Sequence, residues 1–270
     1  MPVSVLVRGP EARGPLVETA VSRAYDELRR VDAVFSTYRP ASEISRLRNG
    51  ELALDECSAE VRDVLALCVN ARVDTDGWFD HELPGHDGTR AVDPSGLVKG
   101  WAVERAAEGL ASLEGHDYLL NAGGDVAIRS ATSPFSVGIQ SPYDREALID
   151  VVQIHRGGVA TSGSYARGGH ILNPRTATPA HDLASASVIG PSVLIADVLA
   201  TALYAEGTAG LNRIEAATGV EALIVRPDGA VLTTTNWPGR VYRIGGHKPS
   251  THWGRDNDRH DRARRDSSTA

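Results

Sequence analysis

The chain of 270 residues is poor in several kinds of residue, and each shortage narrows its possible functions. Its only cysteines, Cys57 and Cys68, are too few for a disulfide framework and lack zinc-ligand spacing. No apolar run reaches the length of about 18 residues that a membrane span needs. Acidic residues outnumber basic ones by 35 to 28, for a formal charge of −7. This balance argues against a protein that binds nucleic acid through excess positive charge.

The two ends of the chain bear on its location and its domain organisation. The N-terminal residues MPVSVLVRGPEARG contain no basic segment followed by an apolar one, so we expect no secretory leader and a cytoplasmic protein. Residues 247–270 are rich in charge, serine and histidine and nearly devoid of aliphatic side chains. That composition is typical of disorder. We therefore expect one folded domain over residues 1–246 and a disordered polar tail over 247–270.

Hydrophobic periodicity between the ends predicts helices and strands that come in blocks. Helices are expected over Val17–Val31, after Ser58, over Pro94–Leu110, Val193–Ala205 and Asn212–Ala217. Strands are expected over Tyr118–Leu120, Val126–Ile128, Phe135–Ile139, Val151–Ile154, Ala222–Val225 and Ala230–Thr233. Because the two kinds of element do not alternate strictly, the pattern favours an α+β fold over a doubly wound parallel sheet.

Asp197 and Thr201 lie four residues apart in the predicted helix Val193–Ala205, so their side chains share one face of that helix. A carboxylate and a hydroxyl on adjacent turns form an all-oxygen pair of the kind that Mg²⁺ accepts, with water and substrate phosphates completing its shell. The spacing also fits a solvated aspartate and a threonine that bonds its own helix backbone. Spacing alone leaves the metal site open.

Lysine is nearly absent, with Lys99 and Lys248 against 26 arginines. A lysine kept in such a background points to a need for its compact ammonium group, and Lys248 lies in the polar tail. Lys99 follows the turn Asp93–Gly96 in the first turn of a predicted helix, where free backbone amides and a cation suit a phosphate. An ordinary capped helix with a surface lysine explains the same residues, so both interpretations stay open.

Two glycine-rich segments complete the candidate functional regions. Residues 121–125, Asn-Ala-Gly-Gly-Asp, lie between predicted strands, where paired glycines suit either a tight hairpin or close approach to a ligand. In residues 160–176, three glycines within Gly163–Gly169 indicate a mobile loop. His170 lies beside this loop and is a candidate base toward a second substrate, because histidine exchanges its proton near neutral pH. A lone histidine is also often structural.

In their order and spacing, these segments resemble the motifs of the ApbE family, the FAD:protein FMN transferases. The resemblance is carried by STYRPASEISRL at Ser36–Leu47, GWFD at Gly77–Asp80, VDPSGLVKGWAVERA at Val92–Ala106, LNAGGD at Leu120–Asp125, ATSGSY at Ala160–Tyr165, HILNPRT at His170–Thr176 and ADVLATAL at Ala196–Leu203. It extends over about residues 1–235, which is most of the chain.

The resemblance implies an α+β fold of mixed or antiparallel sheets with packed helices, and an FAD cleft between two subdomains. It also implies a Mg²⁺-dependent enzyme that cleaves FAD at its pyrophosphate and releases AMP. Such an enzyme joins FMN by a phosphoester bond to a threonine of an acceptor flavoprotein, which carries a Ser/Thr-Gly-Ala-Ser/Thr-type motif. The sequence names neither the acceptor nor the oligomeric state.

Individual residues receive roles from the resemblance where they match the family's motifs. The backbone carbonyl of Gly96 and the side chains of Asp197 and Thr201 would bind Mg²⁺. His170 would be the catalytic base toward the acceptor threonine. FAD would contact Tyr38, at the adenine, together with Trp78, Phe79, Asp80, Asp93, Lys99 and Leu172.

The chain departs from the family pattern at two positions near the histidine. Asn173 replaces the aspartate of the H-x-x-D-P motif, and Ala177 replaces the glycine that follows. Asparagine keeps the hydrogen-bonding shape but loses the charge, so turnover could be lower.

Two alternatives to the transferase stay open. One is a Mg²⁺-dependent FAD pyrophosphatase, in which water replaces the threonine and the products are FMN and AMP. The other is a non-catalytic FAD-binding protein.

Overall fold

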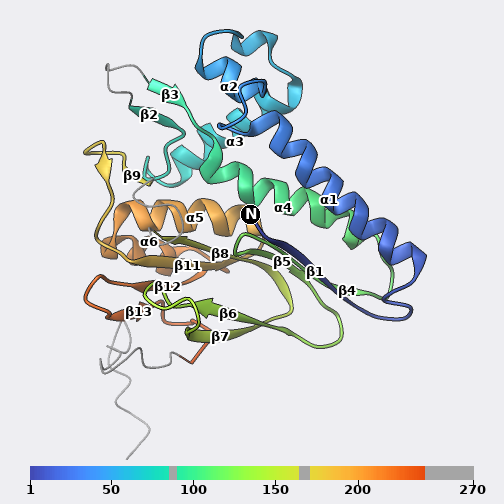
Figure 1. Cartoon of the computed structure of the whole chain (residues 1–270). Coiled ribbons are helices and arrows are strands. Elements are labelled where there is room, and N and C mark those ends of the chain that lie inside the picture. The colour runs from blue at the N-terminus through green and yellow to red at the C-terminus, as the bar shows by residue number, and fades with distance from the viewer. Residues whose placement is uncertain (85–89, 164–170, 241–270) are drawn as a thin grey trace, which may run out of the picture.

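Seven strands form the central sheet, and helices cover one of its faces (Figure 1). A computed structural model describes residues 1–84, 90–163 and 171–240, so His170 and the predicted tail lie outside the described residues. In sheet order the strands are β1 (Val3–Arg8), β4 (Asp117–Ala122), β5 (Asp125–Arg129), β8 (Arg156–Gly163), β11 (Ser185–Gly190), β12 (Glu221–Val225) and β13 (Val231–Thr233). Every strand pairing in the described part of the chain is antiparallel, which confirms the α+β prediction.

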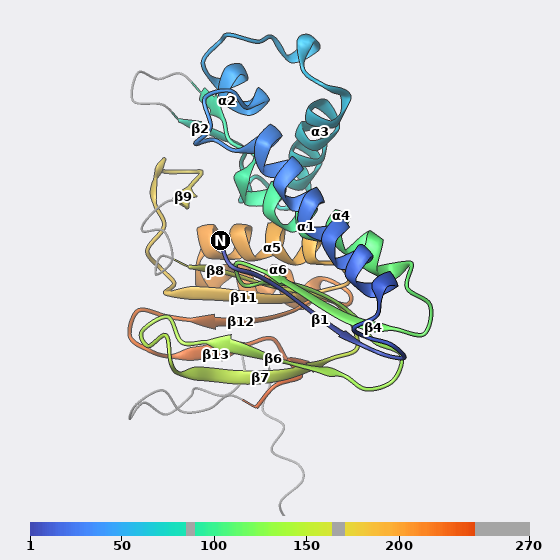
Figure 2. The ribbon, with the colours of Figure 1, turned by 45° about the vertical axis from the view of Figure 1, so that its right-hand side comes forward.

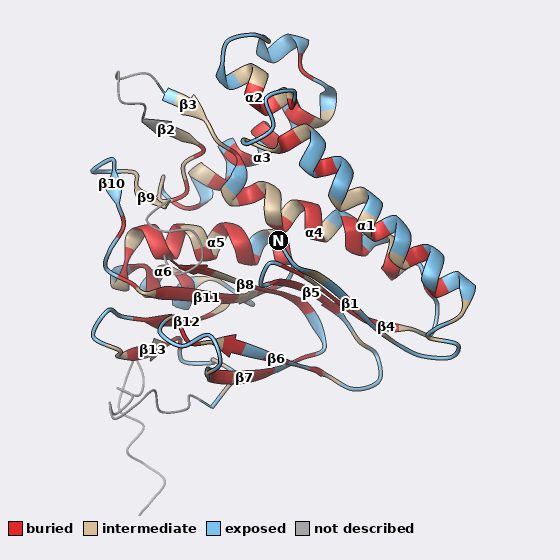
Figure 3. Cartoon of the chain, viewed as in Figure 1, coloured by how far each residue is buried: buried red, intermediate tan, exposed pale blue. Residues whose placement is uncertain are grey.

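Three long helices stack in succession on one face of the sheet (Figure 2). Helix α5 (Val193–Glu206) lies on β8 and β11, α4 (Ser95–Ala111) packs on α5, and α1 (Pro15–Phe35) packs on α4. Since α5 lies between the sheet and α4, it is buried on most of its surface (Figure 3). The remaining helices are α2 (Glu43–Arg48), α3 (Ala59–Asp74) and α6 (Leu211–Ala216), with short 3₁₀ turns at Leu54–Glu56 and Thr208–Gly210.

A hairpin of β6 (Phe135–Gln140) and β7 (Leu148–Ile154) covers the other face of the sheet (Figure 1). Its inward side chains, such as Phe135 and Ile149, form one hydrophobic core with residues of β4, β5 and β12. Two shorter hairpins project beside the helices. They are β2 (Glu82–Pro84) with β3 (Arg90–Val92), and β9 (Leu172–Asn173) with β10 (Thr178–Pro179).

Side-chain caps and glycines explain where several elements begin and how closely they approach. Ser58 accepts a hydrogen bond from the backbone N–H of Val61 and starts α3, as its position in the sequence predicts. Ser192 caps α5 in the same way. Gly158 of β8 lies directly under the start of α5, where an added Cβ would be 2.2 Å from the Cα of Val193. A side chain at this position would push α5 off the sheet.

The predicted elements are present, and the glycine-rich segment 160–176 begins in a strand. Ala160–Gly163 belong to β8, a central strand between β5 and β11, and the predicted loop that follows them falls on residues 164–170, outside the described residues. Strands β8 and β11 were not expected from the sequence. The glycine pair of residues 121–125 forms the tight turn between β4 and β5, with positive φ at Gly123 and Gly124.

Candidate active site

A cavity of about 300 Å³ lies where the first turns of α4, the middle of α5 and the end of β8 meet. It gathers side chains from segments far apart in the sequence, including all ten predicted site residues that the structure describes. These are Tyr38, Trp78, Phe79, Asp80, Asp93, Gly96, Lys99, Leu172, Asp197 and Thr201. The eleventh, His170, lies outside the described residues, although the adjacent Ile171 lines the cavity.

Three charged side chains form a cluster at the cavity floor. Lys99 of α4 and Asp197 of α5 line the cavity, and the fully buried Asp125 of β5 lies next to Lys99. The ammonium nitrogen of Lys99 is 2.9 Å from Oδ2 of Asp125 and 3.5 Å from Oδ1 of Asp197. Asp125 has 0% of its surface exposed and Asp197 has 2%. Oδ2 of Asp197 accepts a hydrogen bond of 2.8 Å from the backbone N–H of Gly100. The floor therefore holds two buried carboxylates and one cation between them.

Burial controls the acidity of the two floor carboxylates. It raises the pKa of Asp125 well above its usual range, and the neighbouring charge of Asp197 acts in the same direction, while Lys99 opposes both. Burial also raises the pKa of Asp197, against the opposing effects of the Lys99 ammonium and the Gly100 N–H. A further cation at this floor would stabilise the ionised form of both groups.

An all-oxygen set faces the cavity beside the floor. Oγ1 of Thr201 is 3.3 Å from Oγ of Ser162 in β8, one helical turn along α5 from Asp197. Gly96 lies opposite, and an added Cβ there would be 3.8 Å from Oγ1 of Thr201 and 3.2 Å from the Phe79 ring. Gly100 permits the close packing of α4 on α5, since its Cβ would be 2.7 Å from that of Asp197. The predicted metal ligands thus lie together across the contact between the two helices.

Asp93 lies just before α4. Its Oδ1 accepts a hydrogen bond of 3.0 Å from the backbone N–H of Ser95, and its Oδ2 is 3.3 Å from a guanidinium nitrogen of Arg48. The start of α4 and Lys99 both face the cavity. Free amides and the helix dipole make a helix N-terminus attractive to anions.

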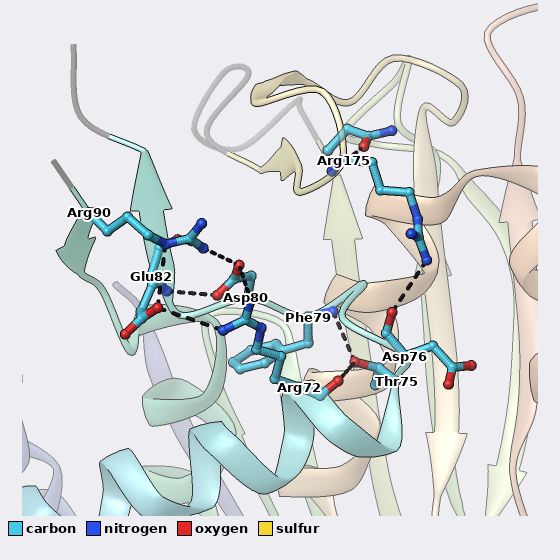
Figure 4. A network of polar contacts seen from close by, with 9 residues as sticks. Arg72, Thr75, Asp76, Phe79, Asp80, Glu82, Arg90 and Arg175 are labelled. Carbon is cyan, nitrogen blue, oxygen red and sulfur yellow. Dashed lines mark hydrogen bonds and ion pairs between the residues drawn. The ribbon is translucent and has the colours of Figure 1, made fainter. Parts of the chain in front are cut away.

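The cavity rim on the side of β2 and β3 is built from paired charges (Figure 4). Arg90 contacts both the carboxylate of Asp80 and the backbone carbonyl of Glu82, and Arg72 lies 3.7 Å from Asp80 and 3.6 Å from Glu82. The backbone N–H of Glu82 donates to Asp80 at 3.0 Å. Asp80 is therefore held by two arginines at the rim. Tyr38 stands nearby with 87% of its surface exposed.

Trp78 and Arg175 meet at the opposite part of the rim. The guanidinium carbon of Arg175 lies 4.6 Å from the centre of the Trp78 ring. Nη2 of Arg175 donates a hydrogen bond of 3.4 Å to the backbone carbonyl of Asp76 (Figure 4). Phe79 is buried beside them, with its backbone N–H bound to Oγ1 of Thr75 at 3.0 Å. The contacts of Arg175 with Trp78 and Asp76 tie the β9–β10 hairpin to the segment that follows α3.

The two departures from the family pattern both lie in the β9–β10 hairpin. Oδ1 of Asn173 accepts a hydrogen bond of 2.9 Å from the backbone N–H of Arg175, a bond that an aspartate would make equally well. Ala177 lines the cavity with a φ of 57°, in the left-handed region that favours glycine. The hairpin keeps its turn in spite of both substitutions.

Several residues that line the cavity or lie beside it were not predicted from the sequence. Asp125 is the last residue of the motif 121–125, and the motif is interpreted through its paired glycines, without a role for the carboxylate that follows them. Ser162 belongs to the unpredicted strand β8. Arg90 and Arg175 are two of many arginines, and no local pattern distinguishes them. The signal for Asp125 was its place directly after a turn that brings backbone close to a ligand site.

The sequence model of the ApbE family matches residues 2–86 and 82–224. The chain belongs to the ApbE family. The match spans every segment that contributes a described residue to the cavity, so the cavity is built entirely from the part of the chain that the family model matches.

Curated relatives match the chain over a shorter stretch than the family model does. The chain is 32% identical over 171 residues to an FAD:protein FMN transferase of Rhodobacter capsulatus, covering 59% of this chain and 32% of the relative. It is 32% identical over 161 residues to the FAD:protein FMN transferase of Salmonella typhimurium, covering 53% of this chain and 45% of the relative. The chain thus spans only 32% to 45% of the length of these curated relatives.

Solved structures show the same fold. The ApbE protein of Thermotoga maritima superposes with a TM-score of 0.73 at 22% identity, over 87% of this chain and 94% of that one. The flavinyl transferase ApbE of Pseudomonas stutzeri gives a TM-score of 0.67 at 24% identity, over 87% and 95% of the two chains. Within the described residues, no helix combines the length and apolar character required to cross a membrane.

Proposed function

We propose that the chain is an FAD:protein FMN transferase, which cleaves FAD, releases AMP and attaches FMN through a phosphoester bond to a threonine of an acceptor flavoprotein. The observation that carries the proposal is the convergence of ten motif residues on one cavity. The names of the curated relatives support the same activity. The acceptor is expected to carry a Ser/Thr-Gly-Ala-Ser/Thr-type motif, as the family resemblance implies.

The donor set of the cavity fits a Mg²⁺ ion. Asp197 and Thr201 offer a carboxylate and a hydroxyl oxygen next to Gly96, whose backbone carbonyl would be the third protein ligand. Among the described residues, no three His, Cys, Asp or Glu side chains gather into a metal cage. Mg²⁺ does not need such a cage, because it retains waters and binds substrate phosphates beside one or two carboxylates. Bound there, it would neutralise charge on the phosphate oxygens of FAD.

The residues of the chain would orient FAD and balance its charge. Lys99 and the amides at the start of α4 would bind the pyrophosphate, since both present positive charge to the cavity. Trp78, Phe79, Asp80 and Leu172 would line the path of the flavin nucleotide. Tyr38 would lie against the adenine at the exposed rim. Phosphoryl transfer depends mainly on positioning and charge neutralisation, which is what these groups can supply.

The acceptor threonine would attack the FMN-side phosphorus in line, and AMP would leave. We propose His170 as the base that takes the proton of the threonine hydroxyl. Ile171 and Leu172, which follow it directly in the sequence, line the cavity. Their position at the cavity supports a role for this segment next to the bound substrate.

An incubation with FAD and Mg²⁺ tests the proposal, with and without an acceptor domain that presents a threonine in the expected motif. Intact mass follows the acceptor and chromatography follows AMP. The transferase predicts a mass gain equal to one FMN moiety, lost in metal-free buffer and in Asp197→Ala. Metal-dependent AMP release without a mass gain, even with several acceptors, would favour the FAD pyrophosphatase. Bound FAD with no AMP would favour a non-catalytic binding protein.

A further inference from the structure

The floor residue Asp125 has no role in the proposed reaction, although it is the most deeply buried of the three charges there. Its Oδ2 is the nearer of the two carboxylate partners of Lys99, at 2.9 Å against 3.5 Å for Oδ1 of Asp197. Neither of its carboxylate oxygens has a hydrogen-bond partner among the described residues, so the ion pair with Lys99 is the contact that compensates its charge. A buried carboxylate is costly to retain, so its position beside the lysine needs a reason.

The two oxygens of Asp197 have different surroundings. Oδ2 is held at 2.8 Å by the backbone N–H of Gly100, which fixes the carboxylate on α5. Oδ1 is therefore the oxygen left for a cation, and it is also the oxygen that faces Lys99. The ammonium group and a divalent cation would compete for the same atom. A lysine drawn fully onto Oδ1 would both occupy the ligand and repel the incoming metal ion.

We propose that Asp125 is a positioning residue that holds Lys99 away from Asp197 and so keeps Asp197 available to a divalent cation. This inference rests on the proposed function for the identity of the cation site. In their ionised forms the three floor groups sum to −1, which attracts a cation. Without the charge of Asp125 they sum to zero, and Lys99 has only Asp197 as its carboxylate partner at the floor.

The fold makes Asp125 suited to this task. It is the first residue of β5, it pairs with Ala122 of β4, and it follows the turn at Gly123 and Gly124. Its backbone is therefore fixed by the central sheet, whereas Asp197 and Lys99 are carried by helices packed on that sheet. Asp125 thus ties the lysine to the central sheet.

Binding of Mn²⁺ to the full chain, measured in the absence of FAD by electron paramagnetic resonance of the free ion, tests the inference. Asp125→Asn is expected to weaken Mn²⁺ binding at least tenfold, because Lys99 then turns to Asp197. The double variant Asp125→Asn/Lys99→Met is expected to recover most of that loss, because the competing ammonium is gone. Equal affinity of Asp125→Asn and wild type, or no recovery in the double variant, would overturn the proposal.

Asp117→Asn is the matched control. Asp117 is also a buried aspartate, but it lies at the opposite end of β4 and binds Ser130, Thr132 and the N–H of Ala131 instead of a lysine. It should leave Mn²⁺ affinity unchanged; a loss equal to that of Asp125→Asn would overturn the proposal by showing a general effect of buried charge. If Asp125→Asn does not fold, Lys99→Met alone carries the test, with tighter Mn²⁺ binding expected and weaker binding contradicting it.

The same variants separate this inference from the proposed function. Weaker Mn²⁺ binding in Asp125→Asn with recovery in the double variant supports the inference even if no variant releases AMP from FAD, which would count against the transferase alone. Metal-dependent AMP release by wild type with unchanged Mn²⁺ affinity in Asp125→Asn would overturn the inference and leave the transferase standing. Wild-type protein that binds no Mn²⁺ in the absence of FAD would overturn the inference, and metal-dependent AMP release from FAD would still decide the transferase.

Discussion

The floor and the rim of the cavity both hold ion pairs, but they differ in burial and in the residues used. At the floor, one lysine lies between two carboxylates that are almost fully buried. At the rim, Arg72 and Arg90 pair with Asp80 and Glu82, and both arginine side chains are more than 40% exposed. Exposed pairs of this kind contribute little to stability because water screens them, whereas buried charges interact strongly.

This difference in burial indicates that the floor and the rim serve different functions. Charges in a dry, rigid site act on a bound phosphate without reorganisation, as charge neutralisation in phosphoryl transfer requires. Arginines at an exposed rim can change partners, because a substrate group can replace a carboxylate at small cost. We therefore expect substitutions at the floor to reduce turnover and substitutions at the rim to change substrate affinity.

The largest effect is expected from Asp197→Ala at the floor. Loss of a metal ligand should lower the kcat/KM for AMP release by about 100-fold or more, since metal assistance contributes several kcal/mol to such reactions. Lys99 retains Asp125 as a partner at 2.9 Å, so the lysine stays neutralised. Chromatography of AMP measures the effect.

Ser192→Ala, on the same helix, is the control for Asp197→Ala. Ser192 caps α5 through the N–H of Ile195 and does not line the cavity. Its loss should lower stability by about 1 kcal/mol and leave AMP release unchanged. A loss of turnover equal to that of Asp197→Ala would show that general damage to α5, not the missing carboxylate, is responsible.

The second prediction concerns pH. The pKa of Asp125 is raised in the folded protein, so this group favours folding below its unfolded pKa and loses that contribution as pH rises through the folded value. In chelator, wild type should therefore lose stability relative to Asp125→Asn as pH rises from about 4 toward the raised folded pKa, by up to about 1.4 kcal/mol per pH unit for one proton. Groups that do not interact with Asp125 cancel in the comparison, whereas Asp197 titrates together with Asp125 as a pair. Thermal unfolding at three pH values measures it; a constant difference would contradict the prediction.

A smaller effect is expected at the rim from Arg175→Met. The stacking of Arg175 on Trp78 is partly exposed, and such contacts contribute about 0.5–1 kcal/mol. We expect the KM for FAD to rise about two- to fivefold with little change in kcat, because the wall formed by Trp78 loses its fixed position. Steady-state kinetics of AMP release separate the two parameters.

Arg29→Met provides the comparison for Arg175→Met. Arg29 also stacks on an aromatic ring, that of Tyr25, at 6.0 Å, and neither residue lines the cavity. Its substitution should change neither KM nor kcat. A fall in kcat for Arg175→Met as large as the rise in KM would contradict the assignment of the rim to affinity.

Elements with a clear local pattern could be predicted from the sequence. Helix α1 shows apolar residues at helical spacing, and α3 begins at the serine cap that the sequence indicates. Strand β8 could not be predicted, because its sequence, RGGVATSG, has two adjacent glycines and little β-branched character. Gly158 is required by the close approach of α5 and Gly157 by that of the Gly190 carbonyl, two tertiary contacts that no local pattern reveals.

The candidate site shows the same division. Motif residues such as Asp197 and Lys99 were predicted, and they meet in one cavity. Which groups pair with which could not be predicted, since the partners of Lys99 come from a strand and a helix well separated in the sequence. The role proposed for Asp125 depends on the packing of α4 against β5, which no local pattern in the sequence reveals.

The smallest expected effect is a gain, from Ala177→Gly in the β9–β10 hairpin. Ala177 has a φ of 57°, and a left-handed conformation costs a residue with a Cβ about 1 kcal/mol or more relative to glycine. Glycine should therefore raise the free energy of unfolding by up to about 1 kcal/mol, after its greater entropy in the unfolded chain is subtracted.

Ala217→Gly should act in the opposite direction and so tests the cause. Ala217 follows α6 with a φ of −85° and a ψ of 131°, an ordinary extended conformation in which alanine carries no strain. Glycine there gains unfolded-state entropy without relieving anything, and it should cost about 0.5–1 kcal/mol. Chemical denaturation of both variants measures the two signs. If both substitutions destabilise the protein equally, the positive φ of Ala177 carries no strain that glycine could relieve, and the prediction is contradicted.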